Sequence, residues 1–118
     1  MTAEEFFGEH AGARDLYAAV LRAMQAVGEP GIRVSKSQIA FLRRRSFAAV
    51  WLPGQYLRRD AAPLVLTLSL PFRDTSPRWK QVVEPTRGRF THHLELHRPD
   101  EVDEEVQQWL QQAWTEAG

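Results

Sequence analysis

Hydrophobic residues recur at two different spacings along the chain, and the change of spacing separates helical from extended parts. Over residues 13–27, apolar side chains return every three or four positions, which is the period of a helix with one buried face. Gly28 and Pro30 follow and predict the end of this helix. Thr2 stands three residues before Glu5, the spacing of a capping box, and predicts a short helix at the beginning of the chain.

The middle of the chain alternates apolar and polar residues with a period of two, which is typical of β-strands. The pattern predicts strands at residues 32–42, 47–52, 64–70, 79–83 and 89–97. Residues 43–46 then form the turn of a hairpin between the first two strands. In the strand at 64–70, four leucines share one side, so that side is expected to face the core.

A second helical pattern closes the chain, with Asp100 as its predicted N-cap. Its apolar stripe consists of Val102, Val106, Trp109, Leu110, Ala113 and Ala117. Helices followed by strands and a last helix predict an α+β fold: a mainly antiparallel, four- to five-stranded sheet with two principal helices, N- and C-terminal, packed on one face. The 118 residues are expected to form a single domain, 1–118.

Composition narrows the class of protein further. The chain has no cysteine, which excludes disulfides and thiolate chemistry and favours a cytoplasmic location. No apolar stretch approaches the roughly 20 residues that span a bilayer, and no secretion signal is expected. The net charge is zero, but residues 31–59 hold seven positive residues and no acid, while residues 95–118 hold seven acids and one arginine. The two regions are expected to attract each other, or to mark a binding face.

Six short motifs stand out in the order in which they occur. They are 36–41 (KSQIAF), 43–48 (RRRSFA), 51–53 (WLP), 76–80 (SPRWK), 91–96 (THHLEL) and the helix 103–114. Together they resemble an uncharacterised bacterial family, a domain of unknown function (number 5655), over residues 13 to the end. The resemblance implies no activity or cofactor, but it draws attention to Lys36, Gln38, Trp51, Arg78, His92 and His93. Where that family often has a histidine before the proline at 85, this chain has Glu84.

A binding site on the open face of the sheet is the principal functional hypothesis. Trp51 would supply an aromatic platform towards which the polar groups of Lys36, Gln38, Arg78, His93 and Glu95 converge. The expected partner is a small anionic ligand or a protein, and a homodimer through this face is the alternative within the same class. In a further alternative, Trp51 simply packs beneath the loop at 55–63.

His92 differs from its neighbour because it falls on the apolar side of its strand, between Phe90 and Leu94. A lone histidine there is expected to be a core residue with both ring nitrogens hydrogen-bonded. At the rim of the sheet it would instead line the pocket as a ligand-binding residue or as an acid or base.

Two other classes of function remain as alternatives. Arg43, Arg44 and Arg45 at a hairpin tip, helped by Arg58, Arg59 and Tyr56, suit contacts with nucleic-acid phosphates, although exposed basic turns also serve solubility. A metal-dependent enzyme would use His93 and Glu95. His93, Glu95 and His97 span about 13 Å at roughly 3.3 Å per residue, too far to share one ion, so neither a metal nor a cofactor is expected. No nucleophile motif supports an enzyme, and a non-enzymatic module is favoured.

Overall fold

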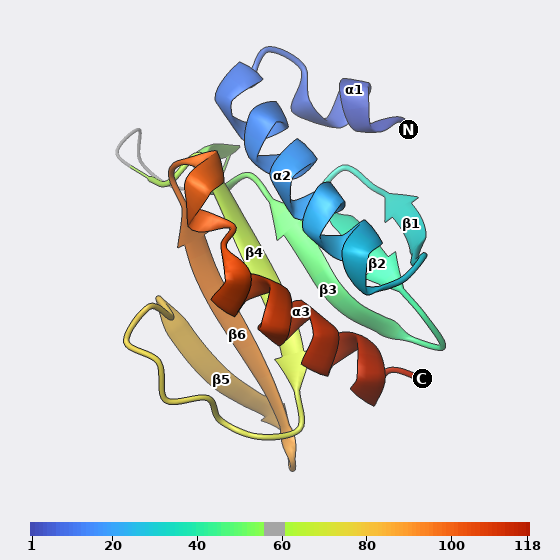
Figure 1. Cartoon of the computed structure of the whole chain (residues 1–118). Helices are drawn as coiled ribbons and strands as arrows, with labels where there is room; N and C mark the ends of the chain where they lie inside the picture. Colours follow the sequence, from blue (N-terminus) through green and yellow to red (C-terminus); the bar gives the residue numbers. More distant parts are fainter. Residues whose placement is uncertain (56–60) are drawn as a thin grey trace.

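The computed structural model describes residues 1–55 and 61–118, which form a sheet with helices on one of its faces (Figure 1). The strands are β1 (Gly31–Val34), β2 (Ile39–Leu42), β3 (Ser46–Trp51), β4 (Leu64–Leu70), β5 (Gln81–Thr86) and β6 (Arg89–Leu96). They form one six-stranded sheet in the order β1-β2-β3-β4-β6-β5, with every neighbouring pair antiparallel. The α+β class and the antiparallel sheet are confirmed, with six strands where four or five were predicted.

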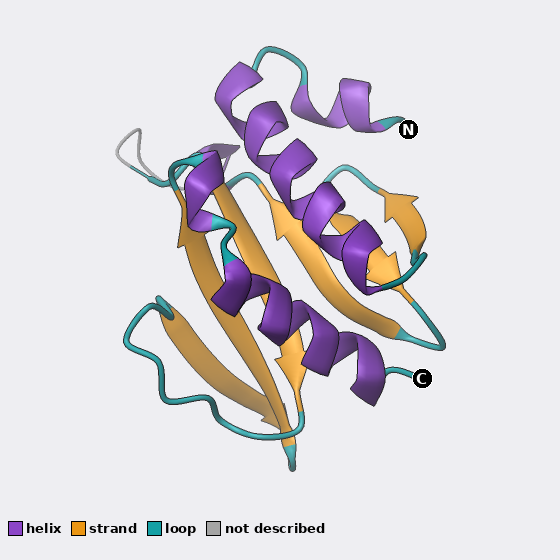
Figure 2. Cartoon of the chain, viewed as in Figure 1, coloured by secondary structure: helices purple, strands orange, loops and turns teal. Residues whose placement is uncertain are grey.

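The α-helices of the described ranges all lie on the same face of this sheet, as Figure 2 shows. They are α1 (Ala3–Phe7), α2 (Ala11–Val27) and α3 (Glu104–Glu116), and the short 3-10 helices η1 (Pro53–Gln55) and η2 (Pro99–Glu101) precede β4 and α3. The predicted capping box holds α1: Thr2 N donates to Glu5 Oε1 at 2.9 Å and Glu5 N donates to Thr2 Oγ1 at 3.1 Å. None of the helices in the described ranges has the length and apolar character needed to cross a bilayer.

The extra strand comes from the stretch predicted as one strand at 32–42, and that prediction is wrong. Ser35 and Gln38 close a turn between β1 and β2, in which Ser35 N donates to Gln38 O at 2.9 Å and Gln38 N donates to Ser35 Oγ at 3.3 Å. A serine side chain that bonds the backbone in this way favours a turn over a continuing strand. As a result Val34 pairs directly with Ile39, and both face the helices, whereas one unbroken strand would have put them on opposite faces.

A bulge explains why β3 is apolar on both sides. Phe41 pairs with Ala48 but Leu42 pairs with Ser46, so Phe47 has no paired residue on β2. A bulge places an extra residue in one strand and interrupts the alternation of faces. Phe47 and Ala48 therefore both join the core, and the Phe47 ring meets the Trp114 ring edge-on, with centroids 5.7 Å apart.

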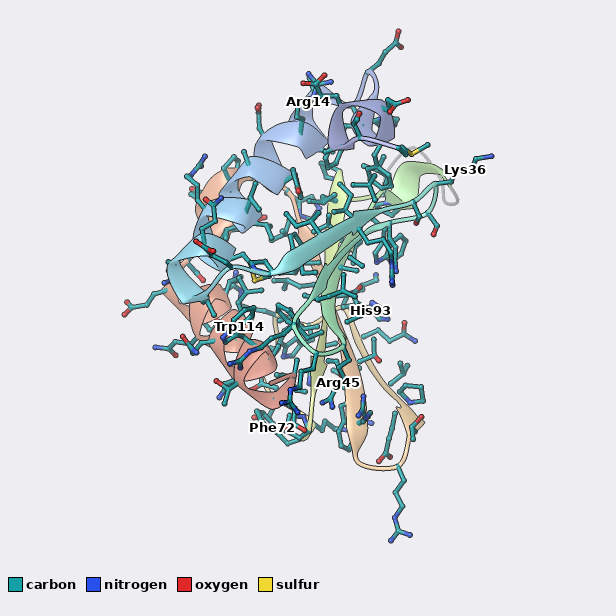
Figure 3. All side chains as sticks on the ribbon, turned by 90° about the vertical axis from the view of Figure 1, so that its right-hand side faces the viewer. Arg14, Lys36, Arg45, Phe72, His93 and Trp114 are labelled. Carbon is teal, nitrogen blue, oxygen red and sulfur yellow. The ribbon has the colours of Figure 1, made fainter. Side chains whose placement is uncertain are left out.

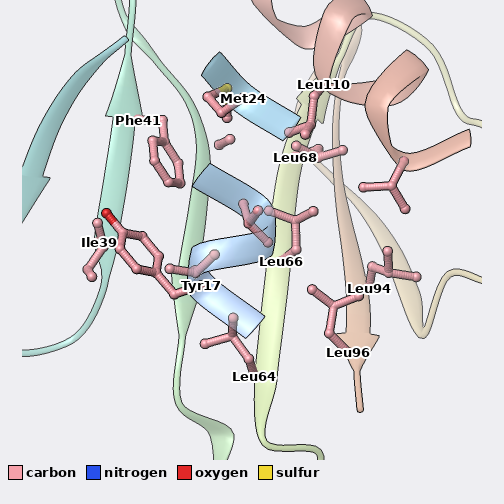
Figure 4. Packing of buried hydrophobic residues seen from close by; sticks show 14 of the residues in the cluster. Tyr17, Met24, Ile39, Phe41, Leu64, Leu66, Leu68, Leu94, Leu96 and Leu110 are labelled. Carbon is pink, nitrogen blue, oxygen red and sulfur yellow. The ribbon is translucent and has the colours of Figure 1, made fainter. Parts of the chain in front are cut away.

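The core lies between the sheet and the two long helices (Figure 4). The strand predicted at 64–70 is confirmed as β4, and its four leucines all face α2 and α3. Leu94 and Leu96 of β6 continue this layer, and Leu16, Val20 and Met24 of α2 pack against it with Leu110 of α3. Each fully buried leucine stabilises the fold by roughly 1.5–3 kcal/mol, so this layer is a large part of the driving force.

The last helix begins later than predicted. Asp100 is not its N-cap, because it lies in η2, where the Glu101 carboxylate accepts from the backbone N–H groups of His97 (2.6 Å) and Arg98 (3.0 Å). Asp103 caps α3 instead, and its Oδ1 accepts from Val106 N at 3.1 Å. Because η2 occupies Pro99–Glu101, α3 begins at Glu104, about one turn later than predicted.

The edge strand β5 also differs from its prediction, 79–83, since it begins at Gln81 and continues through Pro85 to Thr86. Proline cannot donate to a ladder, so it is tolerated only at an edge or an irregularity. The register shifts between Val83 and Thr86, and Gly88 turns the chain into β6 with a φ of 80°. Glu84 stabilises this turn, because its Oε2 accepts from Gly88 N at 2.9 Å.

Candidate functional site

The face of the sheet away from the helices carries the candidate site. Figure 3 shows the molecule from the side, with the helices on one side of the sheet and His93 projecting from the other. Thr67 of β4 pairs with Ala49 of β3 and with His93 of β6, so three neighbouring strands bring their side chains into one row. Trp51 lies two residues along β3 from Ala49, on the same face, and is half-buried like Thr67 and His93.

A chain of hydrogen bonds joins Trp51, Thr67 and His93. Trp51 Nε1 lies 3.0 Å from Thr67 Oγ1, which in turn lies 2.9 Å from His93 Nδ1. The indole nitrogen can only donate, so the Thr67 oxygen accepts from it. The Thr67 hydroxyl keeps its one proton for a second bond, and we assign that proton to His93 Nδ1. The indole and imidazole rings also meet edge-on at 88°, with centroids 6.3 Å apart. We refer to these three residues as the Trp51–Thr67–His93 relay.

The same assignment gives the protonation of His93. Burial lowers the pKa of His93 from its ordinary value of 6.5, so the ring is neutral at pH 7. A neutral imidazole that accepts at Nδ1 carries its proton on Nε2. Within residues 1–55 and 61–118, Nε2 has no hydrogen-bond partner, which leaves one oriented N–H donor on the open face.

Next to the relay lies a pocket of about 250 Å³. Its walls are formed by Trp51, Pro53, Val65, Lys80, Gln81, His93 and Glu95. The first three supply an apolar wall and the last four supply polar groups, a combination typical of small-molecule sites. The start of β5 is held against β6 because Lys80 N donates to His93 O at 2.8 Å. Three predicted site residues, Trp51, His93 and Glu95, therefore meet here.

Gln38 lines a second, smaller pocket of about 160 Å³ on the same face. Its other lining residues are Ser46, Phe47, Ala48, Ala49, Thr67, Ser69 and Thr91. Thr67 connects the two hollows, because it lines this one and bonds to Trp51 and His93 beside the other. Gln38 thus lines the neighbouring hollow and is not among the residues that line the pocket beside Trp51.

Lys36 is not brought to the site. It is exposed in the turn between β1 and β2, and Figure 3 shows it at the edge of the molecule, apart from His93. The lysine that lines the pocket is Lys80. The expected convergence of Lys36 with Trp51 depended on a single strand over 32–42, which the turn at Ser35 interrupts.

Arg78 is also placed elsewhere, on the helix side of the sheet. Its Nη1 donates to both carboxylate oxygens of Asp103 at 3.0 Å and to Glu105 Oε1 at 2.9 Å, and its Nη2 donates to Glu101 O at 2.9 Å. The guanidinium carbon lies 5.6 Å from the centre of the Trp109 ring. Burial opposes the charge, but these acidic partners outweigh it and raise the pKa of Arg78. Arg78 therefore secures the first turn of α3.

His92 is fully buried on the helix side, as expected for a core histidine. Its Nδ1 lies 3.1 Å from Phe90 O and its Nε2 accepts from Asp74 N at 3.0 Å, so both nitrogens are satisfied. Burial lowers the pKa of His92, and the bond to Phe90 only partly offsets this. The Trp79 ring packs on the imidazole at 4.8 Å and donates to Asp74 Oδ2 at 2.8 Å. His92 holds the loop before β5 and does not reach the pocket of His93.

The arginine hairpin lies against the end of α3. Arg43 Nη1 donates to Trp114 O at 3.0 Å, with its guanidinium carbon 4.5 Å from the centre of the Trp114 ring. Arg45 Nη2 donates to Glu116 O at 3.2 Å, and Arg44 N donates to Ala117 O at 3.2 Å. Cationic donors stabilise the free carbonyls and the negative dipole end of a helix C-terminus. Two of the three guanidinium groups therefore have partners within the chain.

Some expectations fall on residues outside the described ranges. These are the help of Tyr56, Arg58 and Arg59 in binding nucleic acid and the packing of Trp51 beneath the loop at 55–63. Within the described ranges, no three histidine, aspartate or glutamate side chains gather closely enough to hold a metal ion. His93 and Glu95 both line the pocket.

Sequence analysis did not single out Thr67, Lys80 and Gln81. Thr67 was visible as a polar residue on the open side of its strand, but its two partners come from β3 and β6 and depend on strand order. Gln81 pairs with His93, and Lys80 precedes it, so both needed the register of β5. Period-two patterns predict faces and carry no information on register between strands.

Comparison with known proteins gives one match. A family model described as "Domain of unknown function (DUF5655)" matches residues 2–117. The match includes α1 and the beginning of α2, which lie before the stretch expected from the motifs. No curated protein and no solved structure matches the chain.

Proposed function

We propose that this chain, which belongs to the DUF5655 family, is a binding module. It holds a small ligand with an anionic group in the pocket beside Trp51. The observation that carries this proposal is the Trp51–Thr67–His93 relay, which fixes an aromatic wall and a hydrogen-bond donor next to Lys80. An anionic group can then accept from His93 Nε2 and pair with the Lys80 ammonium.

Preorganisation supports a binding role. A side chain that is already held in one orientation loses little conformational freedom when a ligand arrives. Trp51 is tied down through its Nε1, and His93 through its Nδ1, so the faces and edges that remain can contact a ligand without further ordering. The indole adds a large apolar area that a flat group can cover.

The hydrogen bonds of Thr67 to Trp51 and His93 argue against a nucleophilic role for Thr67. Its oxygen accepts from Trp51 Nε1 while its proton goes to His93, which resembles the contact between a nucleophile and a base. However, the indole N–H withdraws electron density from that oxygen, and no acid in the described ranges orients His93 through Nε2. We therefore assign the relay to positioning, and the module to binding without catalysis.

A thermal-shift screen tests the proposal. The compounds are benzoate, 3-phenylpropanoate, glucose 6-phosphate and adenosine monophosphate, with the uncharged benzyl alcohol as reference. A ligand at 100 times its Kd raises the stability of the folded state by about 2.7 kcal/mol, which gives a clear rise in Tm. The expected rise disappears in Lys80→Ala and Trp51→Ala and persists in Lys36→Ala, which removes an exposed lysine outside the pocket.

Two results would contradict the proposal. One is the absence of any Tm rise with the four anions, and the other is an equal loss of the rise in Lys36→Ala and Lys80→Ala. Light scattering on the same samples examines the predicted homodimer. A dimer mass that falls to the monomer mass in Trp51→Ala would assign the open face to a second copy of the chain in place of a small molecule.

A further inference from the structure

The charges around the pocket restrict its ligand further. Lys80 and Glu95 are the two charged residues of its wall, and they carry opposite signs. Neither forms an ion pair with the other or with any residue in the described ranges. Arg45, Arg78 and Arg98, in contrast, all pair with carboxylates.

The Glu95 carboxylate makes a purely anionic ligand a poor fit. Glu95 lies two residues beyond His93 on the same side of β6, about 6.6 Å along the strand. Its side chain is half-buried and faces the same hollow as Lys80. A ligand with only an anionic group would partly desolvate this carboxylate and place a like charge near it, both of which cost free energy. A cationic or N–H donor group on the ligand would remove that cost.

The remaining lining residues indicate the shape and apolar character of the ligand. Trp51, Pro53 and Val65 provide an apolar surface, with the orientation of the indole fixed by Thr67. A flat ring suits this wall, because stacked and edge-on aromatic contacts add to simple apolar burial. The volume of about 250 Å³ is below the roughly 300–1,000 Å³ of typical drug-sized sites, so the ligand is small.

We infer that the pocket binds a small zwitterion with a flat apolar body, of the class of the aromatic amino acids. Its anionic group is bound by Lys80 and by the Nε2 proton of His93, its cationic group by Glu95, and its ring by Trp51. This inference rests on the proposed function and names the chemical class of its ligand. Gln81 provides an amide that can bond to either polar group.

Three compounds that share a phenylethyl group test the inference. Phenylalanine carries both charges, 3-phenylpropanoate only the carboxylate and phenethylamine only the ammonium. Binding is measured by titrating each into isotope-labelled protein and following the amide signals of His93 and Glu95 and the indole signal of Trp51. We expect phenylalanine to bind at least about tenfold more tightly than either single-charge compound, which corresponds to about 1.4 kcal/mol.

Charge-removing variants then identify the two partners. Glu95→Gln should abolish the advantage of phenylalanine over 3-phenylpropanoate, and Lys80→Gln should abolish its advantage over phenethylamine. Glu104→Gln, on the outer side of α3, removes a carboxylate away from the pocket and should change neither ratio.

The outcomes separate this inference from the proposed function. If 3-phenylpropanoate binds as tightly as phenylalanine, and Glu95→Gln leaves both unchanged, the zwitterion is refuted while anion binding stands. If phenethylamine binds most tightly, both are refuted. If none of the three shifts these signals, the inference is refuted, and the thermal-shift screen, which requires no cationic group, decides the proposed function separately.

Discussion

Gly28 lies directly beneath the indole ring of Trp114, so close that a methyl group on Gly28 would be 2.5 Å from the ring carbon Cζ2. This glycine ends α2, and its backbone is extended, with a φ of 178°. Glycine is therefore required at position 28, because a side chain there would collide with the Trp114 ring. The contact lets α2 and α3 approach each other above the sheet.

The first prediction follows from this contact. Gly28→Ala should destabilise the protein by about 1–3 kcal/mol, because a large ring in a packed position has to move. Urea denaturation measures the change. Gly12→Ala is the matched control, since Gly12 lies in α2 with nothing within 4 Å of the added methyl, and should stabilise by about 0.4–1 kcal/mol. Equal effects of the two substitutions would show that the Trp114 ring does not confine position 28.

A second prediction concerns the middle residue of the relay. Thr67→Val keeps the shape of the side chain but removes the hydroxyl, which leaves the Trp51 indole N–H and His93 Nδ1 without partners. Because the site is half-buried, losing these bonds should lower the free energy of unfolding by about 1–3 kcal/mol. Ser69→Ala, two residues along the same strand and face, is the control and should cost less than about 0.5 kcal/mol.

The relay also predicts which nitrogen of His93 is protonated. Nitrogen NMR of the imidazole at pH 7.5 should show a proton on Nε2 and none on Nδ1 in the wild-type protein. Thr67→Val should give a mixture of the two neutral forms, because nothing then distinguishes them. A wild-type signal from an Nδ1 proton would contradict the direction of the Thr67 hydrogen bond.

Stability should depend on pH through two histidines. Burial lowers the pKa of both His92 and His93 below the ordinary value of 6.5, so the unfolded chain binds protons more readily than the folded one. Stability from these groups is complete above about pH 6.5, decreases as the pH falls from there to the folded-state pKa values, and then levels off. Denaturation at pH 5.0 to 8.0 measures this. Stability that rises from pH 7 to pH 5 would contradict both shifts.

Replacing Arg78 should destabilise the protein much more than replacing Arg98, although both side chains pair with carboxylates. Arg78 donates to the cap residue of α3 and to a backbone carbonyl, so Arg78→Ala should cost about 1–2 kcal/mol by leaving Asp103 and the Glu101 carbonyl without their charged donor. Arg98 pairs with Asp100 on the surface, with its side chain 70% exposed, and Arg98→Ala should leave the unfolding curve unchanged. Thermal melting of both variants in low and high salt compares them.

Strong periodicity accounts for the parts of the fold that were predicted from sequence. The strand at 64–70 and the long helix ending at Val27 repeat their pattern over several turns or pleats, and both were found at or near the predicted bounds. The turn at Ser35 was missed because no glycine or proline marks it, although residues 35–38 (SKSQ) are four polar residues in succession. The bulge at Phe47 changes the face of one residue, which a regular period does not describe.

The candidate site was predicted in part for a similar reason. Trp51, His93 and Glu95 were expected on the open face and lie there together. Arg78 was expected at the site but lies elsewhere, and Lys80, which was not singled out, lines the pocket. Trp79 between them is anchored in the core by Trp109 and by Asp74. Its anchoring places Arg78 at α3 and Lys80 at the pocket, a long-range effect that spacing along the chain does not contain.

The placement of all helices on one face has a consequence for how such a domain can evolve. Residues that hold the fold together point to one side of the sheet, and most of those that line the two hollows point to the other. Replacing Gln38, Ser69 or Glu95 alters the chemistry of the exposed hollows without disturbing a leucine beneath α2 or α3. The chemistry of the open face can therefore change by single substitutions, each at little risk to folding.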